Sequence, residues 1–131
     1  MKPYIFAVAL TIVATCASAD TAECTEPQTQ SAMNACAYKD FQAADAELNE
    51  YWKFAVAAAR SRDEYLAEGE IPSEDMLREA QRTWIKFRDQ ACLAQSTLAR
   101  GGSLQPLLQY TCLYSTTQYR IPDLISFSPE D

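Results

Sequence analysis

The chain has 131 residues, and its eighteen acidic residues against eleven basic ones give a formal net charge of −7. Phosphate contacts supply most of the affinity for nucleic acid, so this charge argues against a nucleic-acid partner and favours a basic protein. The sequence contains no histidine. That excludes Ser-His-Asp and Cys-His nucleophilic sites in their usual forms and removes the commonest imidazole metal ligands.

Residues 1–19 predict a cleaved signal peptide. Lys2 precedes an apolar run from about Tyr4 to Thr15, and Ala17-Ser18-Ala19 supplies the small-x-small pattern that precedes signal-peptidase cleavage. A membrane-spanning helix needs about 20 residues, so this run is too short to be one, and no later segment is apolar enough to span a membrane. We expect an exported, periplasmic or secreted protein whose mature chain, residues 20–131, forms one domain. With Lys2 removed, that chain has ten basic and eighteen acidic residues and a net charge of −8.

An alternative interpretation makes Cys16 a lipid-attachment site. The run Val13-Ala14-Thr15-Cys16 loosely resembles a bacterial lipobox, in which the residue before the cysteine is normally Gly, Ala or Ser. Thr15 departs from that pattern, so the free protein is favoured over the lipid-anchored one. In both cases Cys16 lies outside the folded domain, and export is expected.

The four remaining cysteines predict two disulfides. Cys24, Cys36, Cys92 and Cys112 are an even number in a short exported chain, as expected in an oxidising compartment. Their separations of 12, 56 and 20 residues do not match the close CxxC-type pairs of zinc sites. We therefore predict no metal site.

The first long helical segment follows Cys24. Thr25 and Gln28 form a possible capping box, which predicts a helical region from near Glu26, with a break between Cys36 and Asp40. At about 100° per residue, one apolar stripe faces the core. Its members are Ala37, Phe41, Ala44, Leu48, Tyr51, Trp52, Ala55, Ala59 and Leu66.

A joint at residues 68–73 separates this helix from the next. Gly69 is expected to end the first helix and Ser73 to cap the second, with Glu74 and Asp75 at the positive end of its dipole. The second helix carries an equivalent stripe. It comprises Leu77, Ala80, Trp84, Phe87, Ala91, Gln95 and Leu98.

The second joint, residues 100–103, contains Gly101 and Gly102 and precedes a third helix, which Pro122 should end near Arg120. Its narrower stripe comprises Leu104, Leu108, Thr111, Cys112, Ser115 and Tyr119. The tail 126–131 is expected to be loose. Because no run alternates with period two for long, the chain is predicted to be all-α, an antiparallel helical hairpin bundle of about three main helices.

The second joint also predicts the disulfide pairing. Cys92 lies ten residues before Gly102 and Cys112 ten residues after it. Two antiparallel helices hinged there would place both cysteines about 15 Å from the turn, so they should bond to each other. Cys24 is then left to bond Cys36.

No catalytic residue or cofactor is predicted. Three glycines, Gly69, Gly101 and Gly102, cannot form a P-loop or dinucleotide-binding pattern. Carboxylate chemistry remains open through Asp45 with Asn49, or Glu47 with Glu50, but such pairs are common on acidic helices. We therefore favour a binding protein over an enzyme.

The stretch from Ala80 to Cys92 is predicted to be a junction. On a helical wheel centred on Trp84, Arg88 lies about 40° away, Cys92 about 80°, and Asp89 about 140°. Trp84 and Phe87 should face the first helix and form a core with its Leu48 and Tyr51, while Ile85 and Cys92 face the third. Arg88 should meet Asp45 or Asn49, which flank Leu48, because a charge at such a seam needs a partner. Asp89 points outward.

Several segments together resemble the LprI-like family of small exported bacterial proteins. They are Met33-Asn34-Ala35-Cys36, the AD-x-x-LN-x-x-Y element at residues 44–51, the W-x-x-x-R-D-x-x-C element at 84–92, Gly101-Gly102-Ser103, and Cys112 with Thr116, Thr117 and Arg120. The match covers about residues 24–124. Pro122 and Asp123 depart from the family, whose helix usually continues towards Leu124. The resemblance implies a disulfide-stapled helical domain and inhibition of lysozyme.

The resemblance and the acidic charge together predict a non-enzymatic binding protein: the charge indicates recognition of a basic partner through acidic surface residues, and the resemblance implies that this partner is the glycoside hydrolase lysozyme. The alternative is a periplasmic or immunity-type module for another envelope protein or toxin, and a carboxylate hydrolase acting on peptidoglycan is a third hypothesis. The candidate contacts cluster at the first joint, with one further acid on the second helix: Asp63, Glu64, Glu68, Glu70, Glu74, Asp75 and Asp89.

Overall fold

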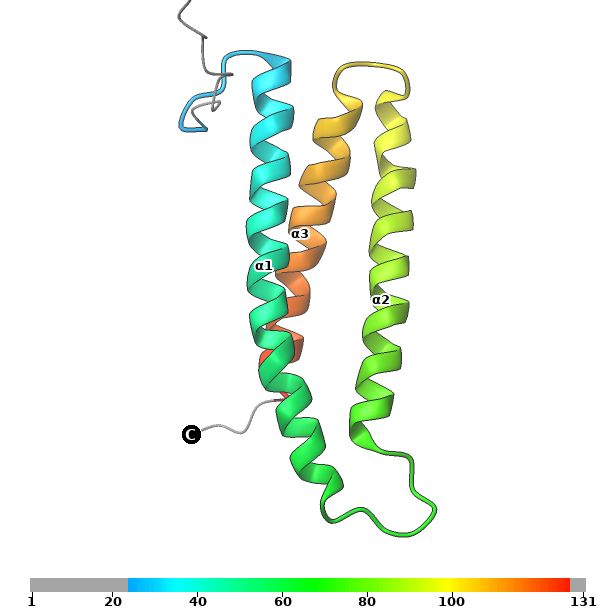
Figure 1. Cartoon of the computed structure of the whole chain (residues 1–131). Helices are drawn as coiled ribbons and strands as arrows, with labels where there is room; N and C mark the ends of the chain where they lie inside the picture. The colour runs from blue at the N-terminus through cyan, green and yellow to red at the C-terminus, as the bar shows by residue number, and fades with distance from the viewer. Residues whose placement is uncertain (1–23, 128–131) are drawn as a thin grey trace, which may run out of the picture.

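A computed structural model describes residues 24–127 and contains three helices, each antiparallel to the one before it (Figure 1). Helix α1 spans Gln30–Asp63, α2 spans Ser73–Ser96, and α3 spans Gln105–Ile125, with a short 3-10 turn, η1, at Thr97–Ala99. No strand occurs within these residues, and the all-α prediction is confirmed. None of the helices described there is long and apolar enough to cross a membrane. The expected signal peptide, Cys16 and the last four residues of the tail lie outside the described range.

Both predicted disulfides are present. Cys24 bonds Cys36 and Cys92 bonds Cys112, with Cα–Cα distances of 5.5 and 5.4 Å. The second bridge joins α2 to α3 across the two helices that flank the α2–α3 loop, and Cys92 is fully buried. The first bridge ties the chain before α1 back onto that helix.

The start of α1 differs from the prediction because of the first bridge. The N-cap is Thr29, whose hydroxyl accepts a hydrogen bond from the backbone N–H of Ala32 at 3.1 Å, and the helix continues without a break through residues 36–40. In a helix beginning near Glu26, residues 24 and 36 would be separated by nearly 18 Å. The Cys24–Cys36 bond requires the chain to reverse first, so the Thr25–Gln28 capping box does not form.

The core lies between the C-terminal half of α1 and the C-terminal end of α3. It contains the buried residues Leu48, Ala55, Val56, Ala59, Leu77, Ile121 and Leu124, with Tyr51, Trp52, Trp84 and Phe127 packed against them. Ala55 and Ala59 are fully buried, and their small side chains allow another helix to approach closely. The predicted core positions Leu48, Tyr51 and Trp84 are therefore in place, the last two as half-buried residues.

Phe87 is not a core residue, contrary to the prediction. Its side chain is 64% exposed, whereas the buried line of α2 runs through Leu77, Gln81, Arg88 and Cys92. This line is narrow and half polar, so apolar periodicity placed the inward face too far towards Phe87. Ala80 and Leu98 from the same predicted stripe are also exposed.

The inward face of α3 also differs from the prediction. Its buried residues are Leu113, Thr117, Ile121 and Leu124, while Tyr119 is 82% exposed. Pro122 lies inside the helix, which continues to Ile125 because Ile121 and Leu124 anchor the last turn in the core. The predicted loose tail is wrong for Phe127, which packs on the core and accepts a hydrogen bond from Arg62.

The two joints use glycine where a left-handed backbone is required. Gly69 and Gly101 have φ of 88° and 76°, a region that residues with a Cβ rarely adopt. However, α1 already ends at Asp63, so Gly69 shapes the following loop and does not end the helix. At the other joint, the Gly101 N–H donates to the Gln105 side chain at 2.9 Å, and Pro106 lies in the first turn of α3.

Candidate functional site

Arg88 is the centre of a polar seam that joins all three helices. Its side chain is only 7% exposed, and its Nη1 donates to Asp45 Oδ1 on α1 at 2.8 Å and to Thr117 Oγ1 on α3 at 3.2 Å. Its Nε donates to Asp89 Oδ1 at 2.9 Å. The predicted contact between Arg88 and Asp45 is therefore present, and Asn49 instead donates to the Asp45 backbone carbonyl at 2.8 Å.

Aromatic rings surround the same guanidinium. Its carbon lies 5.1 Å from the centre of the Trp84 ring and 5.2 Å from that of Phe41, distances suited to cation–π attraction. Arg120 also lies over Trp84, at 5.8 Å, and its Nε donates to the Gln81 side chain. Arg88 and Arg120 each donate through Nε and Nη1 to acceptors within the protein, so this cluster stabilises the bundle.

Sequence reasoning did not identify Thr117, Gln81 or Arg120 as members of this seam. Thr117 is fully buried at a position four residues from both Leu113 and Ile121. In the sequence, a polar residue spaced four residues from two apolar ones on the same helix face was the signal that could have identified Thr117 as a buried polar contact. Asp89, predicted to contact a partner, retains 54% exposure but is paired with Arg88.

Two of the predicted contact acids at the first joint are structural. The Asp63 carboxylate accepts hydrogen bonds from the backbone N–H groups of Ser73 at 2.7 Å and Glu74 at 3.0 Å. The end of α1 therefore caps the start of α2, where Ser73 itself makes no side-chain cap. The hydrogen bond from the Glu74 backbone N–H lowers the pKa of Asp63 below its ordinary value, and hydrogen bonds from the backbone N–H and the hydroxyl of Ser73 add to this effect.

Glu74 links the two helices through a pair of arginines. Its carboxylate accepts from Arg60 on α1 at 2.8 and 2.9 Å and from Arg78 on α2 at 2.6 and 2.9 Å. The hydrogen bonds from Arg60 and then Arg78 lower the pKa of Glu74 to about 2. Both Glu74 and Asp63 thus hold the α1–α2 hairpin closed in their charged forms.

Acid should weaken this hairpin within a defined pH range. The folded pKa of Glu74 is about 2 against an ordinary 4.5, so its contribution is complete above pH 4.5 and disappears as pH falls towards 2. We expect the urea midpoint of Glu74→Gln to lie below that of the wild type at pH 7 and to approach it at about pH 2. Glu79→Gln, which removes an exposed pair with Arg82, is the control. A constant difference between Glu74→Gln and wild type from pH 7 to pH 2 would contradict this assignment.

The remaining acids of the joint form an exposed surface, which we call the α1–α2 tip. It comprises four exposed acids without an ion pair in the described structure and three exposed apolar side chains: Glu64, Glu68, Glu70 and Asp75, with Tyr65, Ile71 and Met76. Tyr65 is 88% exposed, Ile71 65% and Met76 54%. Glu70 also accepts a hydrogen bond from the Ala67 N–H, which stiffens the loop.

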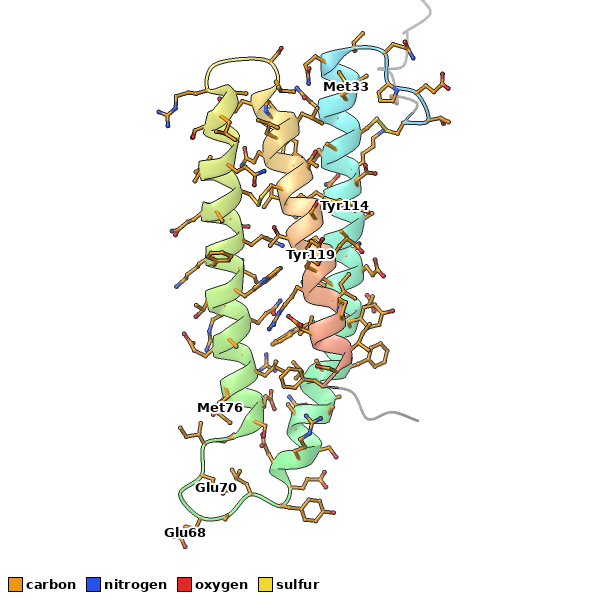
Figure 2. The ribbon with its side chains drawn as sticks, turned by 180° about the vertical axis from the view of Figure 1, so that it is seen from behind. Met33, Glu68, Glu70, Met76, Tyr114 and Tyr119 are labelled. Carbon is orange, nitrogen blue, oxygen red and sulfur yellow. A yellow bond between two sulfur atoms is a disulfide. The ribbon has the colours of Figure 1, made fainter. Side chains whose placement is uncertain are left out.

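The tip projects from one end of the bundle. In both views the α1–α2 loop extends past the last turn of α3, at the end of the molecule opposite the α2–α3 loop (Figures 1 and 2). Figure 2 shows Glu68 and Glu70 on this loop, with Met76 at the adjacent start of α2 and Met33 at the far end. The predicted acids thus divide into two that hold the hairpin and four that lie on its accessible end.

No group of three or more His, Cys, Asp or Glu side chains within residues 24–127 is arranged to hold a metal ion. The acids considered for hydrolysis have other contacts: Glu47 accepts from Gln118 at 3.3 Å, and Glu50 pairs with Lys53 at 2.8 Å.

Comparisons with known proteins identify the family. The family described as "Lysozyme inhibitor LprI" matches residues 16–124. An uncharacterized protein of Rhizobium meliloti (strain 1021) is 37% identical over 128 residues, which cover 90% of this chain and 91% of that protein. No solved structure matches the chain. Because the family match covers most of the sequence, the chain belongs to the LprI family of lysozyme inhibitors.

Proposed function

We propose that the protein is an exported, non-enzymatic inhibitor that binds a basic lysozyme through the α1–α2 tip. The observation that carries this proposal is the combination of uncompensated acids and exposed apolar side chains on a projecting loop. Residues 63–75 contain six acids and no basic residue. After Asp63 and Glu74 are assigned to the hairpin, the other four acids remain exposed at its end.

Charge supports the first stage of this binding. An acidic surface attracts a basic enzyme and raises the rate of association, and salt screens the attraction once the Debye length falls below about 10 Å. The net charge of −7 acts in the same direction over the whole chain. We propose that this encounter takes place in the periplasm or outside the cell, as the expected signal peptide implies.

The apolar residues support the second stage. Interface cores are enriched in aromatic residues and methionine, and a few buried anchors carry most of the affinity. Tyr65 and Ile71 are among the most exposed large apolar side chains described, at 88% and 65%. A stiff projecting loop carrying them can enter a concave surface such as a substrate cleft and obstruct it.

A lysozyme titration tests this function. Mature protein, residues 20–131, should slow lysozyme-driven clearing of a bacterial cell suspension at about 0.05 M salt and less so at about 0.3 M salt. We expect Tyr65→Ala to weaken inhibition about tenfold, as for an interface anchor. Phe87→Ala, which removes another exposed aromatic side chain remote from the tip, should keep full inhibition.

A charge-matched pair of variants separates the tip from general acidity. Replacing Glu64, Glu68, Glu70 and Asp75 by their amides should weaken inhibition about tenfold at low salt. The same change at the exposed acids Glu26, Asp40, Glu47 and Glu50 alters net charge equally but should have a smaller effect. Absence of inhibition at low salt with the protein in molar excess would refute the function, and pull-down from the producing cell's envelope would then test the immunity-type alternative.

A further inference from the structure

A pocket opens between α1 and α2, separate from the tip residues defined above. Its volume is about 220 Å³, and its lining combines apolar surface with hydrogen-bonding groups: Asn49, Trp52, Arg78, Gln81, Arg82 and Ile85. Sites for drug-sized ligands have volumes of about 300–1,000 Å³, so an occupant of this smaller pocket would itself be small.

Gln81 supplies a donor at this pocket. The residue is 6% exposed, and its Oε1 accepts from Arg120 Nε at 3.1 Å, which defines the orientation of the amide because arginine only donates. Its Nε2 donates to none of the residues in the described range. Every fully buried side-chain nitrogen and oxygen in that range has a partner, so this Nε2 must reach solvent, and the pocket is the opening that Gln81 lines.

The other polar groups of the lining are also mostly donors without acceptors. Arg78 and Arg82 use Nε and Nη2 on Glu74 and Glu79, and the Nη1 of each has no acceptor among the described residues. The same holds for the Trp52 indole N–H, which can only donate. Against these donors, the Asn49 side-chain oxygen is the one unpartnered acceptor in the lining. An excess of N–H groups, two of them on cations, favours an occupant that is anionic and accepts hydrogen bonds.

We propose that this pocket binds a small organic carboxylate with a compact apolar group. The carboxylate would accept hydrogen bonds from Gln81 Nε2 and from the arginine Nη1 groups, which the internal ion pairs leave available. The apolar part would pack on Ile85 and the Trp52 ring. This site is independent of the proposed inhibition, because none of its lining residues belongs to the α1–α2 tip.

Benzoate and benzamide provide a matched test with the mature protein. They have nearly the same shape, and only benzoate is charged. The chain contains two tryptophans, so the Trp52 indole N–H can be followed by NMR with the Trp84 indole as internal reference. We expect benzoate to shift the Trp52 resonance saturably with a dissociation constant on the order of 1 mM, and benzamide to bind at least about tenfold more weakly. No Trp52 shift at about 20 mM benzoate, or equal shifts from both compounds, overturns the proposal.

Two glutamate variants locate the binding. Ile85→Glu places a carboxylate in the pocket at a residue that is already 37% exposed, and we expect benzoate binding to weaken about tenfold or more. Leu93→Glu makes the same charge change at a 54% exposed position of α2 outside the lining and should bind as the wild type does. If both variants melt normally and bind benzoate equally, the pocket is not the site. Ile85→Glu should retain lysozyme inhibition, so the two proposals can fail separately.

Discussion

Replacing Arg88 by alanine is expected to lower the free energy of unfolding by about 3 kcal/mol. The change leaves Asp45, Asp89 and Thr117 without their shared donor and removes the cation between Trp84 and Phe41. Loss of one member of a buried ion pair costs about 3–5 kcal/mol, and the lower end applies because the Asp45 side chain is 39% exposed. For a domain of this size the melting temperature should fall by roughly 10 °C or more.

Thermal denaturation followed by circular dichroism measures this effect. Arg82→Ala on the same helix is the control, because its pair with Glu79 is exposed at both ends and should contribute less than about 0.5 kcal/mol. A melting curve of Arg88→Ala that overlaps the wild type would show that the seam does not hold the bundle. Arg88 would then have to be considered for a role outside the fold.

The bridge between α2 and α3 has the second large expected effect. Removing it by Cys92→Ala with Cys112→Ala should cost about 3 kcal/mol, the value that chain entropy gives for a loop of this length. The bridge spans 20 residues, and Cys92 is fully buried, so packing around its sulfur is also lost. Urea denaturation at pH 7 should show a lower midpoint for the double variant.

The other bridge is the control for this prediction. Cys24→Ala with Cys36→Ala should change the unfolding free energy of the bundle by less than about 1 kcal/mol, because residues 24–29 can detach while the helices remain packed. Cys24 is exposed, and Cys36, although only 6% exposed, is not part of the main core cluster around Leu48 and Leu124. Equal losses from both double variants would indicate that the N-terminal segment is part of the cooperative unit.

The charged residues fall into two groups with different roles. Arg88, Glu74 and Asp63 have their partners on other helices or across a joint, and they hold α1, α2 and α3 in register. Glu64, Glu68 and Asp75 lie at the exposed end of the hairpin. The W-x-x-x-R-D-x-x-C element at residues 84–92 is therefore structural, since Trp84, Arg88 and Cys92 all have internal contacts.

Local pattern was sufficient for the helices, the bridges and one long-range contact. A period near 3.6 residues predicted the three helices, and the equal spacing of Cys92 and Cys112 from Gly102 predicted their bond. The wheel position of Arg88 predicted a contact with Asp45 or Asn49, because these residues and Arg88 lie at the edges of facing apolar stripes, and the structure contains the contact with Asp45. These features depend on spacing along one helix or across one short turn.

Other features depended on how far each helix is covered by its neighbours. Phe87 and Tyr119 lie on predicted stripes but face solvent, because periodicity indicates an apolar face without indicating how much of it the bundle covers. Pro122 remains helical because packing of Ile121 and Leu124 outweighs its local preference to end the helix.

Among the acids of residues 63–75, the sequence by itself determined a cluster of like charge at a joint between two helices. Only the tertiary structure separated its members. Asp63 meets the first N–H groups of α2, and Glu74 lies between Arg60 and Arg78, since the loop brings the end of one helix onto the start of the next. Side chains of the same type therefore hold the hairpin or face solvent according to the relative position of α1 and α2, which no local pattern encodes.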